Sequence, residues 1–97
     1  MSNDANAALI ARDQDHLIHP LHSHAAHAGG KVWVRGEGAI LVDANGEEYI
    51  DGLAGLWNNT AGNARRELVD AMSAQVAELA FASGYAGSSN PKAIALA

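Results

Sequence analysis

The fold is decided by residues 31–51, which read KVWVRGEGAILVDANGEEYID. Three runs rich in β-branched, aromatic and other apolar residues alternate here with turn residues, as in antiparallel strands. These runs are residues 31–35, 39–43 and 47–51. Gly36-Glu37-Gly38 separates the first two, and Asn45-Gly46 is a strong hairpin signal because both residue types tolerate positive φ. The stretch therefore predicts a three-stranded antiparallel meander.

Helices are predicted on both sides of the meander. Residues 1–15 are polar and alanine-rich, and we expect a frayed start or a short helix that ends near Asp15. The clearest helix is predicted over 64–80, with Asn63 as its N-cap. Its apolar residues recur at spacings of four, four and three, on one helical face. They are Leu68, Met72, Val76 and Leu79. Asn90-Pro91 then predicts the start of another helix.

Composition excludes several classes of function. The 97 residues include 6 basic and 11 acidic ones, giving a net charge of −5 with neutral histidines. That balance disfavours binding to nucleic acid or to an anionic membrane surface. No run approaches the roughly 20 apolar residues of a membrane-spanning helix. Cysteine is absent, which excludes disulfides and thiolate chemistry and suits a cytoplasmic location.

All five histidines lie between His16 and His27. Spacings of three could direct two imidazoles toward one metal ion. Pro20 interrupts the first three, however, and no Asp or Glu lies between His16 and Gly30 to complete a ligand set. We therefore expect a polar arm that binds no metal. Lys31 and Lys92 are the only lysines, and both are interpreted as surface charges.

The loop over residues 52–62 is both apolar and glycine-rich, which is unusual for a surface loop. Leu56 and Trp57 in this loop should pack against something. They and Tyr85, on a later glycine-rich loop, are either plugs for the core or walls of an apolar pocket.

Several of these segments together resemble the N-terminal part of class III (ω-type) pyridoxal-phosphate aminotransferases, in order and approximate spacing. They are His19-Pro20-Leu21, residues 34–38, residues 42–46, residues 49–57 and residues 65–68. The closest subgroup is the ω-amino acid or amine:pyruvate aminotransferases. Residues 49–57 are the most specific piece.

The resemblance implies a fold class: an α+β segment of the small domain of an α/β, fold-type I pyridoxal-phosphate transferase. It implies an N-terminal arm over 1–30 and the first part of the small domain over 31–83. An interface loop and a truncated helix over 84–97 would lead into the large cofactor-binding domain, which the sequence does not contain. The complete enzyme would be a homodimer or higher oligomer with its active site at the interface. It would use pyridoxal 5'-phosphate, an amine or ω-amino acid, and a 2-oxo acid.

By the same resemblance, the substrate pocket is lined by Leu21, Leu56, Trp57 and Tyr85. The catalytic lysine and the cofactor-binding residues lie outside this segment, so it supplies pocket walls and dimer contacts only. The family usually has glycine where this chain has Ala64. If that position needs positive φ, alanine costs about 1 kcal/mol.

Two alternatives remain open at this point. The chain could be a free-standing binding module with a histidine-rich, possibly metal-binding arm. The complete protein could also be another member of the family, such as a decarboxylase or an aminomutase.

Overall fold

The computed structural model describes residues 4–21 and 23–97, and only the backbone of residues 24 and 86. Its contacts divide the chain into two compact units, Met1–Arg65 and Arg66–Ala97, which are described separately. No helix among the described residues is long and apolar enough to cross a membrane.

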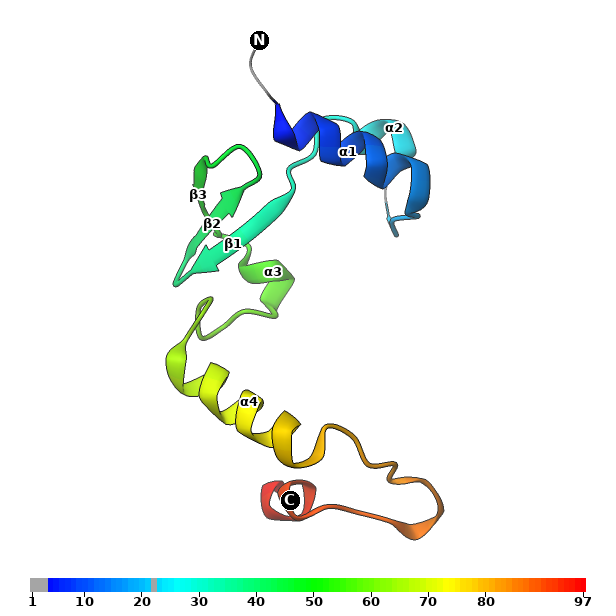
Figure 1. The fold of residues 1–97 in the computed structure, drawn as a ribbon, viewed down its shortest axis with the longest axis vertical. Helices are drawn as coiled ribbons and strands as arrows, with labels where there is room; N and C mark the ends of the chain where they lie inside the picture. Colours follow the sequence, from blue (N-terminus) through cyan, green and yellow to red (C-terminus); the bar gives the residue numbers. More distant parts are fainter. Residues whose placement is uncertain (1–3, 22) are drawn as a thin grey trace. The chain divides into compact units, whose positions relative to one another are not determined.

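The first unit contains the predicted meander (Figure 1). Its strands are β1 (Trp33–Glu37), β2 (Ile40–Asp43) and β3 (Glu48–Ile50), in the order β1-β2-β3. Both pairings are antiparallel, with Glu37 opposite Ile40 and Ile40 opposite Ile50. The prediction of a three-stranded antiparallel meander is confirmed. At the predicted hairpin, Gly46 takes the positive φ, at 87°.

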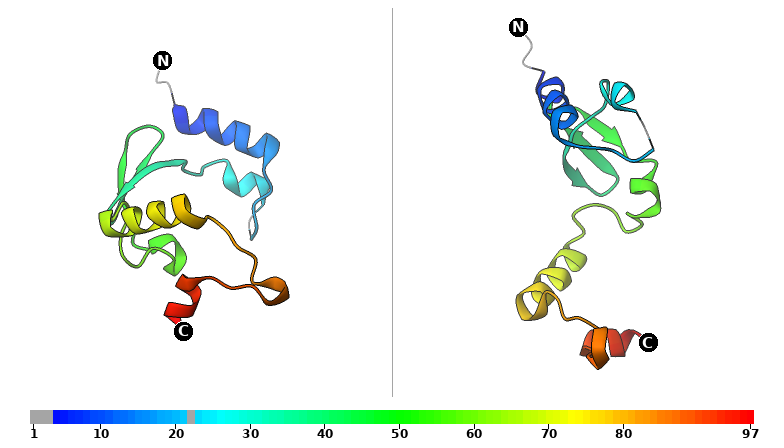
Figure 2. Two further views of the ribbon diagram at one scale, coloured as in Figure 1. Left: turned by 60° about the horizontal axis from the view of Figure 1, so that its bottom comes forward. Right: turned by 90° about the vertical axis from the view of Figure 1, so that its right-hand side faces the viewer.

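Helix α1 (Ala5–His16) is held against the β2–β3 turn by polar contacts (Figure 2). The Asn6 side chain donates to Asp43 Oδ2 over 2.7 Å and accepts from the Val32 amide over 3.0 Å. The Asn6 amide donates to Asn45 Oδ1. We call Asn6, Asp43 and Asn45 the Asp43 hub. Apart from Ile10 and Val42, the residues buried in the described chain are Asn6 and Asp43, so this unit is organised around hydrogen bonds.

Asp43 is the most buried of these residues, with 1% of its surface exposed. Burial alone raises the pKa of a carboxyl group. Hydrogen bonds from the Glu47 amide, the Asn6 side chain and the Asn45 amide, with the nearby charge of Lys31, outweigh burial and lower the pKa of Asp43. Asp43 is therefore a charged group with dedicated donors.

The arm continues from α1 into the short helix α2 (His24–His27), which Ser23 caps by accepting from the Ala26 amide. Beyond the meander, Asn63 pairs with Gly38 through both backbone groups, at 2.8 and 2.9 Å. A Cβ atom on Gly36 would lie 2.7 Å from Asn63 Cγ, so glycine is required there for this close approach.

The second unit contains α4 (Arg66–Leu79), the 3₁₀ turn η1 (Tyr85–Gly87) and α5 (Pro91–Leu96). The predicted helix over 64–80 thus exists but begins at Arg66. The prediction that Asn63 caps it is wrong, because Asn63 belongs to the bridge with Gly38 and its side chain donates to the Gly38 carbonyl. Ala64 has a φ of 54°, which confirms that this position adopts the conformation that favours glycine.

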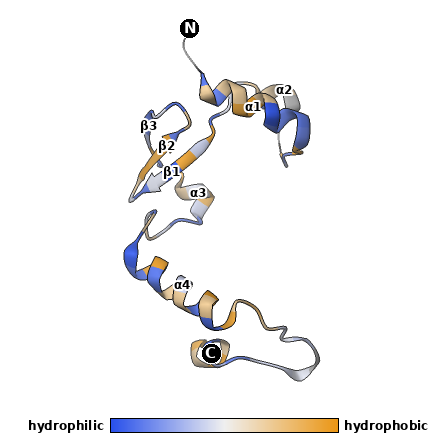
Figure 3. Cartoon of the chain, in the orientation of Figure 1, coloured by the Kyte–Doolittle hydropathy of each residue, from blue (hydrophilic) through white to orange (hydrophobic). Residues whose placement is uncertain are grey.

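Both helices of the second unit have exposed apolar side chains. On α4 these are the residues of the predicted face, Leu68, Met72, Val76 and Leu79. Figure 3 shows hydrophobic and hydrophilic colours alternating along α4. Helix α5 begins as predicted, with Asn90 accepting from the Ala93 amide over 2.9 Å and Pro91 in the first turn.

Candidate functional site

The loop after β3 contains a left-handed turn, α3 (Ala54–Trp57). Its four residues have φ values of 50°, 59°, 57° and 70°. The Trp57 amide donates to the Leu53 carbonyl, and the Asn58 amide and side chain donate to the carbonyls of Ala54 and Gly55. A left-handed conformation costs roughly 1–2 kcal/mol for each residue that has a Cβ atom. Such strain persists where structure and function over-determine it.

This turn directs two large apolar side chains outward. Leu56 is 58% exposed and Trp57 is 84% exposed within the chain. An exposed leucine is ordinary, but an adjacent leucine and tryptophan on a strained turn make an apolar patch that would be covered by another surface or a ligand. The expectation that they pack against something is not met by the described residues.

The other two predicted pocket residues lie on different elements. Leu21 lies on the arm between α1 and α2, with a φ of 67° and its side chain fully exposed. Tyr85 begins η1 in the second unit and is also exposed. Among the described residues, the structure brings only Leu56 and Trp57 of the four onto one element.

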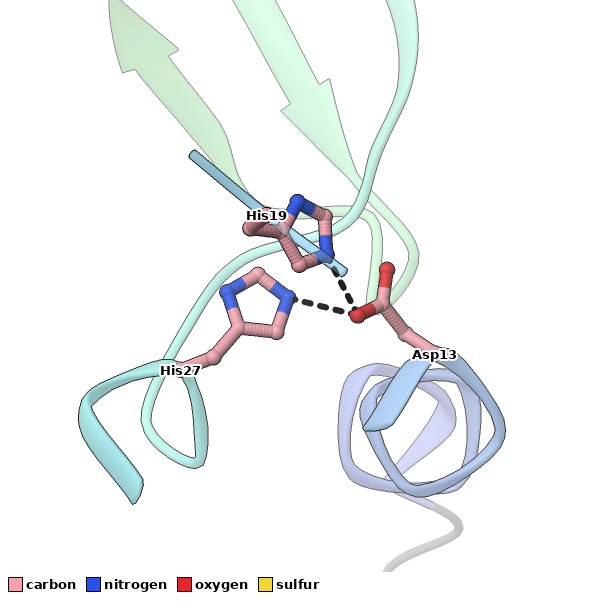
Figure 4. Close-up of side chains that lie close together, drawn as sticks. All are labelled: Asp13, His19 and His27. Carbon is pink, nitrogen blue, oxygen red and sulfur yellow. Dashed lines mark hydrogen bonds and ion pairs between the residues drawn. The ribbon is translucent and has the colours of Figure 1, made fainter. Parts of the chain in front are cut away.

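A cluster of metal-ligating side chains, Asp13, His19 and His27, lies in the N-terminal arm instead (Figure 4). His19 Nε2 lies 2.6 Å, and His27 Nε2 3.1 Å, from the same oxygen, Asp13 Oδ1. The two imidazole rings have centroids 4.3 Å apart. All three side chains are mostly shielded from solvent, with 18–30% of each exposed. Two imidazoles and one carboxylate thus converge on a single point.

Sequence reasoning missed Asp13 because it looked for a carboxylate only between the histidines. Asp13 lies in the last turn of α1, and the chain reverses after His16 so that His19 returns to it. His19 pairs with His27, not with a histidine three residues away. His16 Nδ1 lies 2.8 Å from the Arg12 carbonyl, while His22 and the side chain of His24 are outside the described part.

Neither lysine is placed for nucleophilic chemistry within the chain. Lys31 Nζ lies 3.8 Å from Asp43 Oδ2 and 5.1 Å from the centre of the Tyr49 ring. The hydrogen bond with Tyr49 is the largest influence on Lys31 and raises its pKa. A lysine nucleophile instead needs a lowered pKa. Lys92 lies exposed in the first turn of α5.

Relatives of known function match most of the chain but little of their own length. An adenosylmethionine-8-amino-7-oxononanoate aminotransferase of Geobacter sulfurreducens is 37% identical over 87 residues, covering 88% of this chain and 19% of the relative. A taurine–pyruvate aminotransferase of Rhodobacter capsulatus is 36% identical over 84 residues, covering 84% of this chain and 18% of the relative. No protein-family model matches.

Solved structures agree. An (S)-enantioselective ω-transaminase from Thermomicrobium roseum is 42% identical, with a TM-score of 0.85 over 93% of this chain and 21% of its own. An ω-transaminase from Pseudomonas jessenii, in complex with PMP, is 31% identical, with a TM-score of 0.84 over 92% and 20%. A tryptophan-to-glycine variant of a thermostable ω-transaminase, engineered for synthesis of bulky amines, is 28% identical, with a TM-score of 0.84 over 92% and 20%.

These structural matches cover 92–93% of the chain. The chain therefore belongs to the aminotransferase family that includes the ω-transaminases, and it spans about a fifth of the length of the relatives it matches.

Proposed function

We propose that the chain is the N-terminal segment of a class III, pyridoxal-phosphate-dependent aminotransferase. The complete enzyme transfers an amino group from an amine or ω-amino acid to a 2-oxo acid such as pyruvate. The observation that carries this proposal is the match of nearly the whole chain, in sequence and in fold, to ω-transaminases. The reported relatives are aminotransferases, so a free-standing binding module is not better supported.

The role of this segment is to shape the substrate pocket. Leu56 and Trp57 form one apolar wall, and Leu21 and Tyr85 contribute from other elements. Support comes from the left-handed turn, which holds Leu56 and Trp57 outward on a strained backbone. A tryptophan-to-glycine change adapts one relative to bulky amines, which is consistent with an indole that limits the size of the substrate.

The cofactor is bound elsewhere in the complete enzyme. Pyridoxal phosphate supplies an electron sink for the carbanion formed during transamination. The described residues of this segment do not fit that group: Lys31 is engaged with Tyr49 and Asp43, and the side chains of the turn offer no positive charge to a phosphate. What the segment contributes is apolar surface that excludes water and selects the donor by shape.

The assignment to an aminotransferase also implies what this segment packs against in the complete enzyme. The arm over 1–30, the small-domain part over 31–83 and the interface segment over 84–97 pack against the remainder of the enzyme and a partner subunit. The enzyme is a homodimer or a higher oligomer and works in the cytoplasm. The exposed apolar side chains of α4 and of the turn support the oligomer, because a partner subunit would bury them.

The test is Trp57→Ala in the complete enzyme, with Trp57→Phe as the matched control that keeps an aromatic wall. Removing a pocket contact shifts discrimination between two substrates by about 1–3 kcal/mol. We therefore expect the ratio of kcat/KM for a bulky amine to that for a small amine to rise about tenfold or more in Trp57→Ala and little in Trp57→Phe. Cofactor content and Tm should stay close to those of the parent enzyme. An unchanged ranking of donors at a uniformly lower rate would contradict the assignment.

A further inference from the structure

The cluster of Asp13, His19 and His27 is not used by the proposed aminotransferase function. It joins three elements: the last turn of α1, the arm after it, and the end of α2. The expectation that the arm binds no metal rested on the lack of a carboxylate between the histidines, and Asp13 supplies one from outside that stretch. From this convergence we infer that Asp13, His19 and His27 bind a divalent transition-metal ion, with Zn²⁺ as the ion of choice.

The donor set fits that chemistry. Imidazole nitrogen with one carboxylate oxygen is a ligand combination that Zn²⁺ accepts, and calcium or magnesium would prefer oxygen donors alone. The carboxylate brings one negative charge, and the two imidazoles bind as neutral ligands through Nε2. The remaining tetrahedral position is left for water.

The spacing also fits. Metal–ligand bonds of about 2.0–2.2 Å at tetrahedral angles separate the donor atoms by about 3.3 Å. The candidate donor atoms all lie within 4.8 Å of one another, and the two Nε2 atoms lie 2.6 and 3.1 Å from Asp13 Oδ1. The separations between donor atoms therefore need to change by at most about 1.5 Å. In the metal-free chain the contact between His19 and Asp13 is a hydrogen bond and that between His27 and Asp13 an ion pair, which holds the donor atoms close together.

The surroundings have room for the fourth ligand. A cavity of about 120 Å³ adjoins the cluster and is lined by all three residues together with Leu17, Ile18 and Ser23. A water molecule needs only about 10–15 Å³ of such space. The ion would tie α1 to the segment that follows it, since its ligands come from both sides of the reversal after His16. This is a structural role, and it does not depend on the aminotransferase function.

The test is titration of Zn²⁺ into the complete enzyme, monitored by calorimetry and by the ¹⁵N chemical shifts of its histidine imidazoles. We expect one ion per chain, with shifts at Nε2 of His19 and His27. Asp13→Asn and His27→Ala should weaken binding by about 100-fold or more, because even the outer partners of metal ligands are worth 10–100-fold. Zn²⁺ should also raise the Tm of the parent chain.

The matched controls are Asp15→Asn and His16→Ala, which remove the neighbouring carboxylate and imidazole. Both should bind Zn²⁺ within about threefold of the parent chain, since neither residue belongs to the cluster. A histidine-rich segment that binds metal without a defined site would respond to His16→Ala and ignore Asp13→Asn. That pattern would overturn the inference, as would the absence of stoichiometric binding. If Asp13→Asn unfolds the arm, the imidazole shifts of the parent chain decide the question.

Discussion

The Asp43 hub and the left-handed turn both belong to the first unit, but they differ in which groups they bury and which they expose. In the hub, polar groups are removed from water and each finds a partner within the chain. In the turn, apolar side chains are exposed to water, and the backbone that carries them has unfavourable positive φ angles. The hub is complete by itself, whereas the turn is organised for something that the chain does not contain.

This contrast separates stability from function along the sequence. A buried carboxylate with several donors holds α1 and the meander in one arrangement, because each lost partner leaves a buried polar group unsatisfied. A strained turn with exposed side chains contributes little to the chain's own stability. Its role is to contact another surface or a ligand. The predictions below test this division.

The largest difference in protection from amide hydrogen exchange should appear between the meander and α4 in the free chain. Helix α4 has 14 residues with an exposed apolar face, and isolated helices of that length are marginal in water. We expect the Leu41 and Val42 amides to exchange with solvent deuterium at least about 100-fold more slowly than those of α4, as for a unit with a few kcal/mol of stability. Exchange measured residue by residue by NMR decides this. Equal protection of α4 would show that the second unit is stable alone.

Removing Asn6 should unfold the hub. Asn6→Ala deletes the bonds to Asp43 and to the Val32 amide, and leaving such groups buried without partners costs about 1–3 kcal/mol. Asn58→Ala is the control in the turn, where one exposed bond to the Gly55 carbonyl is lost, and it should cost less than about 0.5 kcal/mol. Urea unfolding followed by circular dichroism measures both. Comparable losses would remove the distinction between the two regions.

Glycine should relieve the turn. Ala54→Gly removes a Cβ atom at a φ of 50°, and the gain of about 1–2 kcal/mol is partly offset by the greater freedom of glycine in the unfolded chain. We expect a net gain of about 1 kcal/mol. The matched change in a right-handed helix, Ala8→Gly in α1, should cost about 1 kcal/mol. Thermal unfolding of both variants measures these effects. If the turn were right-handed, both substitutions would lower the Tm.

The two tryptophans offer a smaller comparison. Trp33 is 46% exposed and meets the Tyr49 ring edge-on, with centroids 5.3 Å apart. Such a pair is worth about 0.5–1.5 kcal/mol, so Trp33→Ala should lower the free energy of unfolding by about that amount. Trp57→Ala in the free chain should change it by less than about 0.5 kcal/mol. A larger loss at Trp57 would make it a core residue.

The hydrogen bonds of the hub should break only when the pH falls below the ordinary pKa of an aspartate. The pKa of Asp43 is lowered in the folded chain, so its contribution to stability is present above the ordinary value of 3.8 and is lost as the pH falls through the lowered pKa. The pKa of Asp4 is lowered too, chiefly by the Asn45 side chain. The amide resonances of Val32 and Glu47 should therefore keep their positions down to about pH 4. Release of α1 at a higher pH would contradict the assigned network.

Local features of the sequence predicted local structure. The Asn45-Gly46 turn and the first helix could be anticipated because neighbouring residues determine them, whereas the positive φ at Ala64 was suggested only by the family resemblance. The Asn6–Asp43 and Asp13–His27 contacts could not, since polar pairs far apart in the chain have no periodic signal. The left-handed turn was missed for a different reason: Ala54, Leu56 and Trp57 are residues that rarely adopt it.

The left-handed turn also has a consequence for chirality. The steric term that penalises Ala54 comes from the L configuration at its Cα, and the mirror-image residue has its energy minimum where L-alanine is strained. A chemically assembled chain with D-alanine at position 54 would retain the methyl group, restrict the unfolded chain more than glycine does, and favour the observed φ. The same substitution at Ala8 would break α1. One unit of the chain thus contains a segment suited to each hand of amino acid.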